Sequence, residues 1–269
     1  MSAPGPCYYS TQEGWEEQQN AQWTQMMQKM DSITTASGQL EYFFLVMAQF
    51  LIENSNGEQA WSGYDMNASS GIETNLSDLM HQVNVCENGQ GSIQNVQMAQ
   101  TDMNNILLEE CTDPAVANKQ MQTQTLDAFQ DLCGDQPNIV TTYSVPVYYD
   151  GSTEPTYVDV PQINMNATQQ QNVLNDWDGN AYIVNPAGQP TATSMTPSNQ
   201  GYQAYLAAQS QWTSDLTTVD DSCGEVDQMA QAEYSQDESN EKTELGTLED
   251  AFNNFVKNQS YWNQQTGNS

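Results

Sequence analysis

The first quarter of the chain carries hydrophobic residues at alternating intervals of three and four, interrupted by the polar Ser37. This spacing places them along one face of a helix and is typical of a heptad seam that packs lengthwise on a partner. It predicts a long helix from about Trp15, ended by the polar segment 54–57, Asn-Ser-Asn-Gly. The seam consists of Trp23, Met26, Met30, Ile33, Leu40, Phe44, Met47 and Leu51.

Hydrophobic residues are densest in the thirteen positions from Leu40 to Ile52. Residues outside the seam widen the apolar stripe there nearly all round the helix, so we expect burial on several sides. A contact between two helices needs less apolar surface than this, which favours a second partner, such as another copy of the chain. The segment is too short to cross a bilayer. The widening residues are Tyr42, Phe43, Leu45 and Val46.

Residues 70–134 show a second helical pattern. Ser70 stands three positions before Glu73, which is the spacing of a capping box. Glycines at 89 and 91 mark a stop, and Asp113 with Pro114 marks a fresh start. We therefore expect two or three antiparallel helices, of which the first carries Ile72, Leu76, Leu79, Val83 and Cys86 at 4-3-4-3 intervals.

The pattern changes between residues 135 and 196. Segments 139–149 and 156–160 are rich in β-branched and aromatic residues and are separated by a turn sequence, which predicts a β-hairpin. Pro146 and Pro155 confine this hairpin to an edge or a short sheet. A short helix over 168–177, a strand over 181–184 and a linker complete the expected insert.

The last segment contains no further proline after Thr196 and Pro197, a favourable start for a helix. We expect one helix to about Trp262, with a phase shift of its seam across 233–244 and a bend or hinge near Gly224 or Gly246. Its seam consists of Tyr205, Trp212, Leu216, Val219, Cys223, Val226 and Ala230, then Leu245, Leu248, Phe252, Phe255 and Trp262.

Together these patterns predict a mainly α fold, in which long N- and C-terminal amphipathic helices form a coiled coil or helical bundle around a small β-rich insert. The expected regions follow the chain in order. They are a flexible tail over 1–10, a helical region over 11–134, the strand-containing insert over 135–196, and a long helix over 197–269.

Charge excludes one class of partner. The 35 acidic residues face four lysines and no arginine, for a net charge of −31. Nucleic-acid binding requires clustered basic side chains, so it is excluded, and anionic membrane surfaces are disfavoured for the same reason. The four lysines are scattered at Lys29, Lys119, Lys242 and Lys257.

Catalytic and metal-binding groups are scarce in the sequence. His81 is the one histidine, and the usual general bases and anion-binding groups are mostly missing, so we expect no enzyme, cofactor or zinc site. Asp176, Asp178 and Asn180 alternate as calcium ligands do, but they lack the later bidentate glutamate. A simple turn explains this segment equally well.

Five cysteines are widely spaced at positions 7, 86, 111, 133 and 223. Disulfides and reduced thiols both remain open. Because the number is odd, two internal bridges would leave one thiol, and Cys7 near the N-terminus is the candidate for an intermolecular disulfide. The N-terminus lacks the basic and apolar regions of a signal peptide. We expect an extracellular or cell-surface protein exported without a cleaved leader.

Long terminal amphipathic helices around a variable, strand-containing middle resemble the architecture of type III secretion filament and needle-tip proteins and, more distantly, flagellin. The resemblance spans roughly 11–57 and 197–265. In those families the terminal helices form the coiled coil that polymerises or docks, while the middle faces outward. The resemblance implies that the two terminal seams form the assembly interface of this chain.

Three functions are compatible with the sequence. The first is a secreted structural subunit that self-assembles into a filament or secretion-apparatus appendage, with a secretion chaperone as a further partner. The second is a monomeric effector or adhesin whose insert binds a host surface protein. The third is a viral or phage structural protein. Copies that each carry a charge of −31 repel one another, so assembly should depend on salt or divalent cations.

Overall fold

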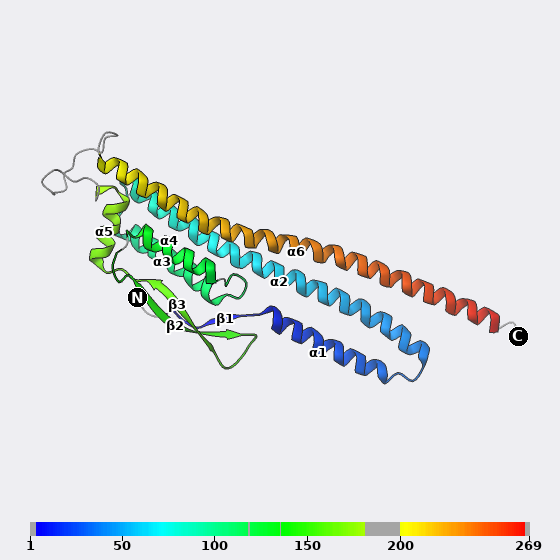
Figure 1. Cartoon of the computed structure of the whole chain (residues 1–269). Coiled ribbons are helices and arrows are strands. Elements are labelled where there is room, and N and C mark those ends of the chain that lie inside the picture. Colours follow the sequence, from blue (N-terminus) through cyan, green and yellow to red (C-terminus); the bar gives the residue numbers. More distant parts are fainter. Residues whose placement is uncertain (1–3, 118, 135, 181–199, 267–269) are drawn as a thin grey trace. The chain divides into compact units, whose positions relative to one another are not determined.

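The structure, a computed structural model, describes residues 4–117, 119–134, 136–180 and 200–266 (Figure 1). It is mainly α-helical with a small three-stranded sheet, which confirms the expected fold class. The chain divides into two compact units, unit 1 with residues 1–9 and 65–227, and unit 2 with residues 10–64 and 228–269. The described residues of the β-rich insert lie within unit 1.

Helix α1 (Gln12–Asp31) and helix α2 (Ala36–Glu87) replace the single N-terminal helix that the seam predicted. The chain leaves α1 at Ser32, whose backbone N–H bonds to the carbonyl oxygen of Lys29. The expected stop at 54–57 is wrong, because α2 continues through it for another thirty residues.

The reason lies in the small residues that follow the expected stop. Ser55, Ser62 and Ser69 recur every seven positions, and all three are buried. Each polar or glycine residue in a helix interior costs at most about 1 kcal/mol relative to alanine, which packing along a continuous seam outweighs. The heptad pattern thus persists through α2 with serine in place of larger apolar residues.

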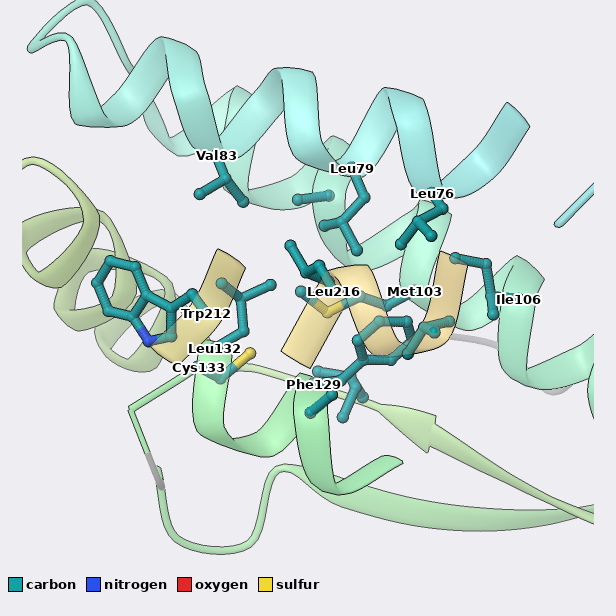
Figure 2. Close-up of a cluster of buried hydrophobic side chains, with 14 of the residues drawn as sticks. Leu76, Leu79, Val83, Met103, Ile106, Phe129, Leu132, Cys133, Trp212 and Leu216 are labelled. Atoms are coloured by element: carbon teal, nitrogen blue, oxygen red, sulfur yellow. The ribbon is translucent and has the colours of Figure 1, made fainter. Parts of the chain in front are cut away.

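The core of unit 1 forms where four helices meet (Figure 2). They are the second half of α2, helix α3 (Ile93–Thr112), helix α4 (Lys119–Leu132) and the first half of helix α6 (Gln200–Thr266). Full burial of each large apolar side chain stabilises this core by about 1.5–3 kcal/mol. Among its members are Leu76, Leu79, Val83, Met103, Ile106, Phe129, Trp212 and Leu216.

The predicted hairpin is confirmed as strand β2 (Val140–Tyr149) paired antiparallel with strand β3 (Thr156–Ile163). Asn104 of α3 fixes the end of β3, since its Nδ2 donates to the Ile163 carbonyl (2.9 Å) and its Oδ1 accepts from the Ile163 N–H (2.7 Å). The short helix is confirmed as α5 (Ala167–Trp177). The Trp177 indole N–H donates to the Leu132 carbonyl at 2.8 Å, which ties α5 to α4.

Strand β1 (Cys7–Tyr9) was not predicted, because residues 1–10 were expected to form a flexible tail. It pairs in parallel with β2 so that Cys7 lies beside Val147 and Tyr9 beside Tyr149. The rings of Tyr8 and Tyr148 stack at 5.0 Å. Pairing and ring stacking both involve residues distant in sequence, which explains why three residues gave no local strand pattern.

Helix α6 continues without interruption through Gly224 and Gly246, so neither glycine breaks its hydrogen-bonded backbone. Its first half belongs to unit 1 and its second half to unit 2. The expected strand at 181–184, the linker and the helix start at 196–197 lie outside the described residues. The Trp262 side chain, expected in the seam, lies outside them as well.

In unit 2, helix α1 lies antiparallel beside the first half of α2 (Figure 1). The Trp23 and Phe50 rings meet at 4.8 Å, and Lys29 Nζ lies 5.7 Å from the centre of the Tyr42 ring. No side chain of α1 is fully buried. The helix therefore covers α2 only in part.

Candidate assembly surface

The sequence-predicted interface residues fall into two environments. Trp212, Leu216 and Val219 in unit 1 are at most 5% exposed, and Val226 packs against the same core while half-buried. All four side chains belong to or pack against the core of unit 1, and Figure 2 shows Trp212 and Leu216 within it. The seam residues of unit 1 therefore stabilise its own core, and little of their surface is accessible to another copy of the chain.

The other predicted interface residues belong to unit 2, and none of them is fully buried. Among the described residues of unit 2, only Val46 and Ala230 are buried hydrophobic residues. Leu40 and Phe252 are 39% and 40% exposed. The remaining members are half-buried, namely Trp23, Met26, Met30, Ile33, Phe44, Met47, Leu51, Leu245, Leu248 and Phe255.

Four of the predicted residues, Phe44, Leu245, Leu248 and Phe252, line an open apolar groove between α2 and α6 in unit 2. Its volume is about 530 Å³, and its walls come from Phe44, Leu45 and Ala48 on one side and Leu245, Leu248 and Phe252 on the other. The Phe44 ring lies 5.5 Å from the Phe252 ring and 5.9 Å from the Phe255 ring, so the two seams do contact each other. Hydrophobic packing thus holds the two walls of the groove together, but the open side of the groove remains exposed to solvent.

The interface predicted from the seam omits the groove residues that lie off it, although Leu45 was among the residues expected to widen the apolar stripe. Leu45 is 66% exposed, and the carboxylates Glu41 and Glu249 stand with it at the groove. The density of apolar residues from 40 to 52, which exceeds what one helix contact needs, is the sequence signal for Leu45. The acidic residues carried no such signal.

No protein-family model, curated protein or solved structure matches this chain. Evidence for function must therefore come from its own side chains. Within the described ranges, no helix combines the length and the hydrophobicity needed to cross a membrane. The same ranges contain no group of three or more histidine, cysteine, aspartate or glutamate side chains arranged to hold a metal ion.

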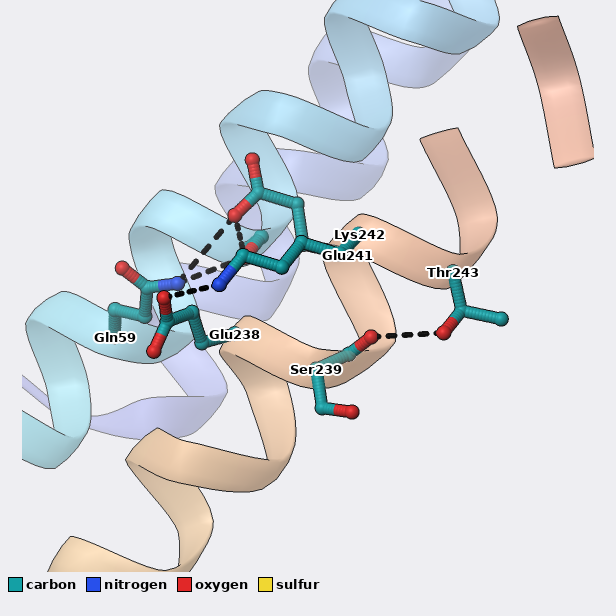
Figure 3. A network of polar contacts seen from close by, with 7 residues as sticks. Gln59, Glu238, Ser239, Glu241, Lys242 and Thr243 are labelled. Carbon is teal, nitrogen blue, oxygen red and sulfur yellow. Dashed lines mark hydrogen bonds and ion pairs between the residues drawn. The ribbon is translucent and has the colours of Figure 1, made fainter. Parts of the chain in front are cut away.

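The seam of unit 2 becomes polar beyond the groove (Figure 3). Ser55 Oγ donates to Glu241 Oε2 at 3.0 Å, and Gln59 Nε2 lies 3.5 Å from the same oxygen and 3.2 Å from Ser55 Oγ. These contacts join α2 to α6 through polar side chains. Such bonds contribute about 1 kcal/mol each, so this part of unit 2 is held less firmly than the core of unit 1.

Acidic side chains crowd this polar part of the seam. Burial raises the pKa of Glu58, and the negative charges of Asp237, Glu244 and Glu16 raise it further. Burial also raises the pKa of Asp237. The nearby Lys242 pairs with Glu238 on the exposed side of its own helix (Figure 3).

All five cysteines are free in the structure. Burial raises the pKa of the Cys86 thiol to about 11 and that of the Cys133 and Cys223 thiols to about 12, so these three remain neutral and unreactive. Cys7 lies in β1, half-buried against the sheet. An intermolecular disulfide through Cys7 stays a prediction, and it would require this strand to expose its thiol.

Two minor candidates from the sequence have structural explanations. His81 is exposed on α2 beside a shallow hollow that Trp212 also lines. Asp178 accepts hydrogen bonds from the backbone N–H of Asn180 (2.8 Å) and from its Nδ2 (2.6 Å). This local pairing is that of a turn after α5, which favours the turn over the calcium site.

Proposed function

We propose that the chain is a structural subunit, extracellular or at the cell surface, that self-assembles through the exposed apolar face of unit 2. The observation that carries this proposal is the contrast between the two units. Nearly all the fully buried hydrophobic side chains belong to unit 1, whereas unit 2 holds its hydrophobic residues half-covered around an open groove. An isolated protein gains nothing from leaving such a surface in water.

Charge sets the conditions under which copies can meet. Unit 2 carries fourteen acidic residues against Lys29, Lys242 and Lys257. Apolar contact between copies must therefore overcome electrostatic repulsion. The Debye length, over which this repulsion extends, is about 8 Å at physiological ionic strength and about 30 Å at 0.01 M. Assembly should accordingly strengthen with salt.

Sedimentation velocity and negative-stain microscopy across salt concentration test the proposal. We expect large oligomers or filaments at about 0.15 M salt that dissociate at about 0.01 M. Leu45→Asp should abolish them, because it puts a charge at the mouth of the groove while leaving the buried core intact.

Met98→Asp provides the matched control. Met98 is 44% exposed on α3 in unit 1, so this variant also adds a charge at an exposed apolar position, but outside the proposed surface. It should assemble as the original chain does. Monodisperse monomers at every salt concentration would refute self-assembly.

A second function is favoured by the sheet of unit 1. Tyr8 is 71% exposed and Tyr157 is 66% exposed, and their strands flank β2. Exposed tyrosines supply apolar area together with a polar hydroxyl, a combination common in protein-binding surfaces. A soluble monomer that binds a host surface protein and loses that binding in Tyr157→Ser would support this alternative.

A further inference from the structure

Three helices of unit 2 meet at a small hollow separate from the apolar groove. Trp15 of α1 and Trp61 of α2 line it with their indole rings, and Glu58, Glu233 and Asp237 add three carboxylates. Its volume is about 220 Å³, which is below the roughly 300–1,000 Å³ of pockets for drug-sized ligands. The hollow therefore suits a small group.

The position of Trp15 is fixed by a close approach between α1 and α2. Gly57 leaves room for the indole, and a methyl group at that position would overlap ring atoms Cζ2, Cε2 and Nε1 of Trp15. The Trp61 ring packs against the Tyr64 ring, with 5.3 Å between their centres. Contacts within the chain therefore position both tryptophan rings before any ligand binds.

The walls carry negative charge with no cation among the described residues that line the hollow. Of the lysines in unit 2, Lys242 pairs with Glu238 and Lys29 lies over the Tyr42 ring. Glu58 of α2 is also close to the carboxylates of Asp237 and Glu244 on α6 and of Glu16 on α1. Such a charge imbalance is relieved by a positively charged ligand.

A small polar residue, Ser62, completes the wall of the hollow. Its side chain lines the hollow while the residue is only 2% exposed. The hollow therefore offers a hydroxyl group as well as carboxylates to a ligand.

We propose that this hollow binds an alkylated ammonium group, either on a small molecule such as choline or on a methylated lysine of a partner protein. The indole faces attract the cation through their quadrupoles, and the carboxylates balance its charge. A bulky, weakly hydrated ammonium group fits aromatic walls better than a metal ion does, because metal ions require several oxygen ligands at short distance.

Isothermal titration calorimetry on the full chain tests this proposal with choline and its neutral isostere 3,3-dimethyl-1-butanol. The two have the same shape and differ in charge. We expect choline to bind at least about tenfold more tightly, because the isostere loses both the cation–π and the carboxylate attraction. Equal binding of the two compounds, or binding of neither, would overturn the proposal.

Variants then locate the binding site. Glu58→Gln and Trp61→Leu should each weaken choline binding by about tenfold. Glu233→Gln should also weaken choline binding, and because Glu233 is exposed, this substitution should not affect folding. The matched control is Glu249→Gln, which removes a carboxylate of the same unit at the apolar groove and should leave choline affinity unchanged.

A trimethyllysine peptide distinguishes the two sources of the group. Tighter binding of the peptide than of choline would assign the hollow to a modified partner, and the reverse would assign it to a small molecule. Displacement of choline by calcium at equal concentration would instead indicate a metal site and would refute the proposal. Because the hollow and the groove share no residue, self-assembly can fail without affecting this result.

Discussion

The hydroxyl of Thr125 on α4 donates a 2.7 Å hydrogen bond to Oε1 of Glu110 on α3, in the interior of unit 1. Neither residue is exposed to solvent, and Oε2 of Glu110 lacks a hydrogen-bond partner in the described part of the chain. Burial raises the pKa of Glu110 to about 7, opposed by the Thr125 hydrogen bond and reinforced by Glu109. Burial likewise raises the pKa of Glu109 to about 7.

This arrangement predicts that the chain is more stable in mild acid than at neutral pH. Because the pKa of Glu110 in the folded state lies above its ordinary value of 4.5, the folded state binds more protons than the unfolded state between these values. Its stabilising contribution is complete below pH 4.5 and is lost as the pH rises through 7. The loss from this one group is about 3 kcal/mol.

Denaturant unfolding at pH 5 and pH 8, followed by circular dichroism, measures this difference. Glu110→Gln should reduce the difference between the two pH values by about 3 kcal/mol, because glutamine does not titrate. Glu154→Gln in the exposed turn between β2 and β3 should leave it unchanged. A chain that gains stability from pH 5 to pH 8 would contradict the prediction.

The buried glutamate shows where sequence reasoning ends. Glu110 follows two leucines and another glutamate, and nothing in that local pattern distinguishes a buried carboxyl from an exposed one. Only the packing of α4 against α3 places Thr125 beside it. Distant residues therefore decide which polar side chains enter the core.

The helices themselves were largely predictable, because heptad spacing directly reports the buried face. The failure at 54–57 came from treating asparagine, serine and glycine as a stop. Ser55 lies four positions after Leu51 and starts a series with a period of seven, Ser55, Ser62, Ser69, Leu76 and Val83, so the periodicity was a better guide than residue type. For the candidate surface, the seam residues were found from the sequence, but which of them stay exposed depends on how many helices cover each half of α2.

The pair of hydrogen bonds between Asn104 of α3 and the backbone of Ile163 in β3, called here the Asn104 clamp, predicts how α3 holds the sheet. Asn104→Leu would leave the Ile163 N–H and carbonyl buried without their partner. Each unsatisfied backbone group costs about 1–3 kcal/mol, so we expect the free energy of unfolding to fall by about 2–4 kcal/mol. Asn105→Leu, at the exposed neighbouring position on the same helix, should change it by less than about 0.5 kcal/mol. Equal effects of the two substitutions would contradict the clamp.

Leucine truncations compare the two units directly. Leu79 is fully buried in unit 1, so Leu79→Ala should reduce the free energy of unfolding by about 2–5 kcal/mol. Leu45 is 66% exposed at the groove, so Leu45→Ala should change the stability of the monomer by less than about 0.5 kcal/mol. Chemical denaturation at low salt, where copies remain apart, checks both values. A large loss in Leu45→Ala would mean that the groove is closed within the monomer.

Two glycines of helix α2 in unit 2 provide a matched pair for the contact with α1. A methyl group at Gly63 meets no atom within 4 Å, so Gly63→Ala should stabilise the helix by up to about 1 kcal/mol through its higher helix propensity. The same methyl group at Gly57 overlaps the Trp15 indole, so Gly57→Ala should displace α1 despite an equal gain in propensity.

Hydrogen exchange and tryptophan fluorescence separate these outcomes. Gly57→Ala should lose amide protection in α1 and shift the fluorescence to longer wavelength as Trp15 enters water, whereas Gly63→Ala should keep both signals unchanged. Because Trp15 also lines the acidic hollow, choline binding should weaken in Gly57→Ala alone. Equal amide protection of α1 in the two variants would show that Trp15 does not pack on Gly57. It would also contradict the assignment of Trp15 to the wall of the hollow.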